Sequence, residues 1–174
     1  NMGIQFETDY NMETLTAMAK GLRKTVRKKR SRRVHIFAAV VLILGLLTIL
    51  ATTAGGEPLG ASGVVTLLAL LVVILVSLFE DRLNAWFARK RLLPGTEHAA
   101  ATFEEDGYVS ATGVTESRFS YAQIVAVAET ARYFVFALSS HHTQAYDKRT
   151  IRGGSVEDFR AFIAEKTGKL VEKI

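Results

Sequence analysis

The sequence predicts a membrane protein of the α+β class, in which a transmembrane hairpin of two helices carries a small antiparallel β-barrel or split barrel closed by a C-terminal helix. Two observations support this. Most of the aliphatic side chains lie in two runs without Asp, Glu, Lys or Arg, Val34–Gly56 and Leu59–Phe79, and the chain after residue 93 has short β-type segments followed by one helix pattern. We therefore divide the 174 residues into an N-terminal strand and basic helix (1–33), a hairpin with a juxtamembrane extension (34–93) and a β domain (94–174).

Each apolar run is about 20 residues long, and a helix of that length spans about 30 Å, the thickness of a bilayer's hydrocarbon core. A secretory signal explains the first run less well, because a signal's apolar region has about 7–15 residues and lies near the N-terminus. Core helices of a soluble bundle would need a polar face, which Val40–Leu47 and Val64–Val76 lack. The sequence thus favours a two-span hairpin over both alternatives.

Positive charge gathers beside the first apolar run. Nine of the 22 lysines and arginines precede Val34, four more lie at 82–91 after the second run, and the connector between the runs carries only Glu57. Because basic flanks stay in the cytoplasm, both termini are expected there. A polybasic segment beside a span meets anionic lipid head groups first, which argues against a nucleic-acid partner. The predicted membrane-surface patch consists of Arg23, Lys24, Arg27, Lys28, Lys29, Arg30, Arg32 and Arg33.

The N-terminal segment contains one short strand and one amphipathic helix. Ile4 and Phe6 alternate with polar residues, which is typical of a strand, but the sequence does not reveal its partner strand. From Asn11, a candidate N-cap, apolar residues recur every three or four positions with basic residues between them. This helix is expected either to lie along the inner head-group layer or to pack on the C-terminal domain, and the sequence does not separate the two.

The hairpin offers little chemistry of its own. Its connector, 54–60, is glycine-rich and too short for an external binding domain, and the apolar runs carry no ionisable residue at mid-depth. Small residues such as Gly45 would allow helices to approach, so self-association is possible. The second helix is expected to continue past the head groups, with Trp86 and Phe87 as interface anchors, and to end before Pro94-Gly95.

The segment after Gly95 predicts an antiparallel meander and a closing helix. A helix begins after Ser155, where Asp158 completes a capping-box pattern, and ends near Gly168. Its apolar face would cover the open side of a small sheet, which gives a split barrel. The candidate strands, bounded by turn residues such as Asp106-Gly107, are Ala99–Glu104, Tyr108–Ala111, Ser117–Tyr121, Ile124–Thr130, Tyr133–Leu138 and Thr143–Asp147.

Candidate reactive groups are better explained as structural. The chain has no cysteine, so thiolate metal sites and thiol nucleophiles are excluded. His141-His142 has no further ligand nearby and fits a hairpin loop, and His98 stands alone in the sequence. The acidic run Glu104–Asp106 precedes Gly107 and fits a hairpin turn. We expect no catalytic residue, no metal and no cofactor.

One loop is a candidate anion site. Gly153, Gly154 and Ser155 precede the last helix, so backbone N–H groups and the helix dipole would favour a phosphate there. Lys148, Arg149 and Arg152 lie just before it. The simpler alternative is a solvated basic loop ending in a helix cap.

The order of these parts resembles the YcxB-like family of bacterial membrane proteins, which have a two-span hairpin and a small domain similar to pleckstrin-homology (PH) domains. The resemblance implies location in the bacterial inner membrane and a PH-like fold, but no assigned activity. At two places the chain departs from the family's pattern: Ala122, near which a tryptophan is common, and Asp147, where a proline is common. The resemblance rests on 102–107, Tyr121 with Ile124, Val127 with Glu129-Thr130, Tyr133-Phe134, Lys148-Arg149 and 158–160.

Two functional hypotheses follow. In the first, the cytoplasmic domain is a membrane-anchored interaction module, without enzymatic activity, for a protein partner or anionic lipid. In the second, the hairpin self-associates as an accessory subunit of a small transporter, or the chain protects the cell against a membrane-active peptide or other membrane stress. The second hypothesis would require several copies to build a polar pathway, because the apolar runs hold only small residues and threonines as lining.

Overall fold

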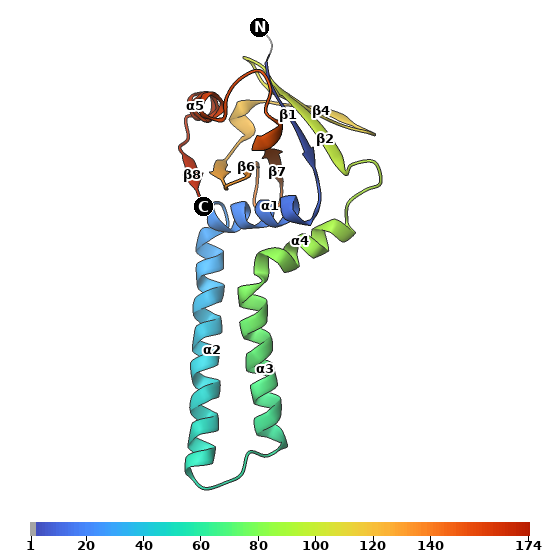
Figure 1. Ribbon diagram of the computed structural model, residues 1–174. Coiled ribbons are helices and arrows are strands. Elements are labelled where there is room, and N and C mark those ends of the chain that lie inside the picture. Colours follow the sequence, from blue (N-terminus) through green and yellow to red (C-terminus); the bar gives the residue numbers. More distant parts are fainter. Residues whose placement is uncertain (1–2) are drawn as a thin grey trace.

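A β-rich domain stands at one end of a long helical hairpin in the computed structural model, which describes residues 3–174 (Figure 1). The hairpin consists of α2 (Lys28–Ala54) and α3 (Ala61–Leu78), which run side by side. Both helices are long and apolar enough to cross a membrane, and almost none of their apolar side chains is buried within the chain. They are therefore not the core helices of a soluble fold.

Gly45 sets the spacing of the hairpin. A Cβ atom at this position would lie 2.7 Å from Cδ2 of Leu70, the one side chain of α3 that is buried. The Leu70 side chain thus packs against the backbone at Gly45. The absence of a side chain at Gly45 permits this contact between the two helices of the hairpin. The threonine hydroxyls of both helices donate to carbonyl oxygens of their own helix, as Thr48 does to Leu44 and Thr66 to Ser62.

The second helix does not continue straight past the hairpin, which corrects the sequence prediction. It ends at Leu78, and after Phe79 a separate helix α4 (Glu80–Lys90) turns aside to run across the base of the domain (Figure 1). There it packs on α1 (Met12–Lys24), burying Ala85 completely. This packing explains the turn, because a straight helix would leave that contact unmade. The helix ends before Pro94, as predicted.

The first sheet contains the N-terminal strand, whose partner the sequence did not reveal. β1 (Ile4–Asp9) pairs antiparallel with β2 (His98–Phe103) along its whole length. β3 (Tyr108–Thr112) and β4 (Glu116–Phe119) complete the order β1-β2-β3-β4. The chain turns from β2 to β3 where Glu104 N–H donates to the Gly107 carbonyl, so the acidic run forms the expected hairpin turn.

The second sheet has the order β7-β6-β5-β8. β5 (Ala126–Glu129), β6 (Tyr133–Ala137) and β7 (Thr143–Asp147) form the antiparallel part. β8 (Val171–Lys173) was not predicted, and it pairs parallel with β5. Along the chain, the 3-10 turn η1 (Tyr121–Gln123) lies between the last strand of the first sheet and the first strand of the second. It begins with a capping box at Ser120. The predicted single meander is therefore two sheets, one of them mixed.

Both sheets and α5 (Val156–Thr167) enclose one aromatic core. Phe159 of α5 lies 4.8 Å from Phe6 of β1, 4.8 Å from Phe103 of β2 and 4.9 Å from Phe134 of β6, measured between ring centroids. The closing helix and its Ser155 cap are thus confirmed. Among residues 3–174 no barrel closes, because β1 and β7 are joined by the hydrogen bond from Asp147 N–H to Thr8 Oγ1 and not by a strand ladder.

Helix α1 lies between this domain and α4. Its N-cap Asn11 accepts a hydrogen bond from Thr14 N–H, and the Thr14 hydroxyl donates to the Tyr133 hydroxyl of β6. Gly21 allows the closest approach, since a Cβ there would lie 2.6 Å from Cγ1 of Val135. The sequence left open whether this helix lies along the head-group layer or packs on the C-terminal domain. In the structure it packs on the domain.

Candidate functional site: an arginine pocket

In the predicted anion loop, residues 148–155, two basic side chains form ion pairs with carboxylates of the domain. Lys148 Nζ, on the 3-10 turn η2 (Lys148–Thr150), lies 2.6 Å from Glu129, and the Arg149 guanidinium lies 3.2 Å from Asp147. Arg152 is exposed, and its backbone bridges to Gln5 of β1. Lys148 and Arg149 therefore already have carboxylate partners within the chain.

Two backbone donors at the start of α5 are also engaged. Ser155 N–H donates to the Asp158 carboxylate, and Asp158 N–H donates to the Ser155 hydroxyl, each at 3.0 Å. Gly153 has a φ of +82°, and a Cβ there would lie 2.7 Å from the Gly3 carbonyl oxygen. Gly154, between Gly153 and Ser155, is exposed and lies close to Ile4. The helix N-terminus thus has its own carboxylate in place of an external anion.

Glu129 is the centre of a buried ion cluster. Its side chain is only 3% exposed and accepts two hydrogen bonds from Arg160 as well as the contact from Lys148. Hydrogen bonds from the Arg160 guanidinium, helped by Lys148, lower the pKa of Glu129 from 4.5 to about 2 against the opposing effect of burial. Since these residues come from β5, η2 and α5, the cluster fastens α5 to the second sheet.

The predicted basic patch divides into a paired and an exposed part. The Arg23 guanidinium donates from Nε and Nη2 to both carboxylate oxygens of Asp81, each at 2.8 Å, and so ties α1 to α4. Arg27 donates to the Ser140 carbonyl at 2.7 Å and contacts His141 Nδ1 at 2.9 Å. The exposed members are Lys24, Lys28, Lys29, Arg30, Arg32 and Arg33.

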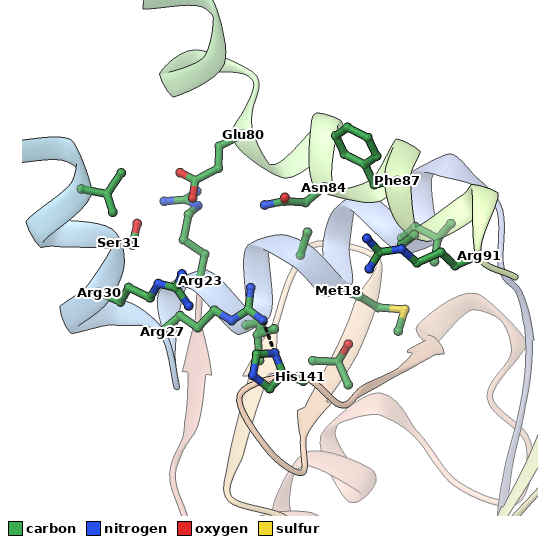
Figure 2. A pocket seen from close by; sticks show the side chains of 16 residues that line it. Met18, Arg23, Arg27, Arg30, Ser31, Glu80, Asn84, Phe87, Arg91 and His141 are labelled. Carbon is green, nitrogen blue, oxygen red and sulfur yellow. Dashed lines mark hydrogen bonds between the residues drawn. The ribbon is translucent and has the colours of Figure 1, made fainter. Parts of the chain in front are cut away.

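A cavity of about 470 Å³ lies where the hairpin meets the domain (Figure 2). Helix α1, the first two turns of α2, α4 and the loop before β7 form its walls. We call it the arginine pocket, because Arg23, Arg27, Arg30 and Arg91 line it together with one carboxylate, Glu80. Its volume is in the range of ordinary ligand sites, about 300–1,000 Å³.

Three of these arginines lack a carboxylate partner. Within residues 3–174, Arg27, Arg30 and Arg91 form no ion pair, and Arg30 and Arg91 make no side-chain hydrogen bond. Glu80 lies 3.1 Å from His35 Nε2 of α2. The pocket is therefore a site of uncompensated positive charge.

Residues 103–163 match a family model described as YcxB-like protein. The chain carries a YcxB-like domain. The match runs from the end of β2 to Ile163 of α5 and confirms the resemblance expected from the sequence. Comparison with curated proteins gave no match, and comparison with solved structures gave none either.

The arginine pocket draws on residues outside the YcxB-like match. Only His141 and Thr143 of its lining fall within 103–163, and the arginines come from 23–30 and from Arg91. The sequence identified Arg23, Arg27 and Arg30 as part of a surface patch but did not include Arg91 or Asn84. The three-residue spacing of Arg27 and Arg30 was the signal in the sequence that these side chains share one helix face. No pattern in the sequence indicated the turn after Phe79 that brings α4 beside them.

The remaining predicted residues have local partners. Trp86 and Phe87 on α4 stack edge-to-face at 5.0 Å, about half exposed, with Lys90 Nζ 3.7 Å from the Trp86 ring. His98 Nδ1 lies 2.6 Å from Asp9, its neighbour on β1, and both side chains are exposed. His141 and His142 lie in the loop between β6 and β7, as expected.

Proposed function

We propose that this chain is a two-span protein of the bacterial inner membrane, with both termini in the cytoplasm, and that its YcxB-like domain is a non-enzymatic interaction module held against the inner leaflet. The observation that carries this is the position of α1, which packs on β6 and β7 with one face and on α4 with the other. The domain and the hairpin are thereby joined by a packed helix and the Arg23–Asp81 ion pair.

The hairpin supports the membrane part of the proposal. Its helices expose apolar side chains along their length, such as Phe37 at 71% and Leu78 at 73%. Exposed apolar surface of this extent in a monomer marks an interaction site, and helices of this length match a bilayer. The basic residues lie at the domain end of the hairpin, which is the end expected to stay inside.

The domain supports the binding part. Two open four-stranded sheets closed by a C-terminal helix are the parts expected of a PH-like domain, and we assign that likeness as part of the proposal. The module would bind at the leaflet that α1 and α4 face. The transporter alternative gains no specific support from the described residues, where the threonine hydroxyls of the hairpin bind their own backbone.

Reporter fusions and the single tryptophan test this proposal. A fluorescent protein fused after Ile174 should fluoresce, and alkaline phosphatase inserted in the connector 55–60 should be active. In vesicles, Trp86 emission should be quenched more by lipids brominated near the head group than by lipids brominated at the chain end, because α4 lies at the boundary. An active phosphatase behind Ile174, or a chain that stays in the aqueous phase without detergent, would overturn the proposal.

A further inference from the structure

We propose that the arginine pocket binds the phosphate of an anionic phospholipid head group. This inference rests on the proposed function, because it requires the hairpin to lie in a membrane. The pocket lies between α1, the start of α2 and α4, at the end of the hairpin next to the domain, which is the level where the head groups of the inner leaflet would lie. A lipid phosphate would thus meet the pocket without leaving the bilayer.

The arrangement of arginines fits a phosphate. Figure 2 shows Arg23, Arg27 and Arg30 gathered at one end of the pocket, with Asn84 of α4 pointing toward the same end and Arg91 apart from them on the other side of Asn84. Guanidinium groups bind phosphate oxygens through paired N–H donors, and an uncompensated cluster favours an anion. Because Asp81 compensates the charge of Arg23, the charges left for a ligand near it are those of Arg27 and Arg30. Ser140 and His141 hold the Arg27 guanidinium by hydrogen bonds without neutralising its charge.

The start of α2 adds to this preference. Its N-cap is Arg27, which makes no side-chain capping bond, and its first turn contains no acidic residue. By contrast, α1 and α5 have side-chain caps and acidic residues in their first turns. The positive end of the α2 dipole therefore faces the arginine end of the pocket without a carboxylate of its own.

The apolar lining distinguishes a lipid from free phosphate. Val34 of α2 and Phe87 of α4 line the pocket, and the exposed apolar surface of α2 begins at Val34. A phospholipid could place its phosphate at the arginines and its acyl chains along α2. A free phosphate would leave this apolar path unused.

Native mass spectrometry of the full-length chain in a neutral detergent tests the inference. Titration with phosphatidylglycerol should show one lipid bound in preference to phosphatidylcholine. Replacing both Arg27 and Arg30 by glutamine should weaken that first binding by about tenfold or more, because each charge-assisted hydrogen bond contributes on this scale. The matched control R32Q/R33Q removes two exposed charges of the same helix outside the pocket, and should change binding less than about twofold.

The outcomes separate the possible sources of the phosphate. Equal losses in the two double variants would mean general attraction to charge and would overturn the inference, as would binding of inorganic phosphate that phosphatidylglycerol does not displace. Should R27Q/R30Q fail to insert, R27K/R30K retains the charge and should still bind more weakly, because lysine lacks the paired donors. If Trp86 lies at the membrane boundary but no lipid preference appears, this inference fails while the proposed function stands.

Discussion

Glu129 shows how a single carboxylate links three elements of the domain. It comes from β5, and its partners Lys148 and Arg160 come from η2 and α5. A buried carboxylate paired in this way is costly to disrupt, because removing it leaves two cations without compensation. The same pairing makes part of the domain's stability depend on pH.

The pH dependence has a definite sign. The pKa of Glu129 is lowered to about 2 in the folded chain, so the stabilisation is complete above its ordinary pKa of 4.5 and is lost as the pH falls toward 2. Glu129→Gln should cost roughly 3 kcal/mol at neutral pH. Thermal unfolding in detergent, followed by circular dichroism, should show the difference between wild type and variant shrinking between about pH 4.5 and 2. The exposed Glu172→Gln on β8 is the control, and a difference that is constant with pH would contradict the assignment.

At the scale of elements, two glycines determine how helices approach their neighbours. Gly21 brings α1 against Val135 of β6, and Gly45 brings α2 against Leu70 of α3. Neither position needs a positive φ, so close packing is the reason for glycine there. The contact of α2 with α3 and the contact of α1 with β6 both depend on the absence of a side chain at these two glycines.

A larger residue at Gly45 should loosen the hairpin. Gly45→Ile would displace Leu70 and is expected to destabilise the folded chain by about 1–3 kcal/mol. Ala39→Ile places the same side chain at an exposed position of α2 and should change little. Thermal unfolding of the full-length protein in detergent compares them. Equal melting temperatures for the two variants would show that the Gly45–Leu70 contact does not hold the helices together.

At the scale of the whole molecule, the β domain is built from both ends of the chain. β1 forms the outer strand of the first sheet, and its Phe6 ring contacts Phe103, Phe134, Tyr146 and Phe159. The YcxB-like match, residues 103–163, therefore contains most of this core, and β1 supplies a further part of it from outside the match. The hairpin is an insertion between two parts of one folded unit.

This insertion predicts which fragments fold. Residues 95–174 alone lack β1 and α1, so they should give a poorly dispersed amide NMR spectrum. A chain in which a flexible Gly/Ser linker replaces residues 28–79 keeps β1, α1 and α4, and should give a dispersed one. A well-dispersed spectrum from 95–174 would show that the N-terminal strand is dispensable.

The sequence by itself determined which segments form most of the helices and strands. Uniformly apolar runs of bilayer length predicted α2 and α3, alternation and turn residues predicted most of the strands, and Ser155 with Asp158 predicted the start of α5. These signals are local, because each arises from residues a few positions apart.

Only the tertiary structure decided how distant segments meet. The pairing of β1 with β2 and of β8 with β5 joins residues far apart in the chain, and no local pattern encodes it. The predicted anion loop proved to have carboxylate partners, Glu129 for Lys148 and Asp158 for its backbone, that only folding brings into contact. In the same way, the arginine pocket exists because α4 turns at Phe79 and packs on α1, a choice made by side-chain packing between helices about 60 residues apart in sequence.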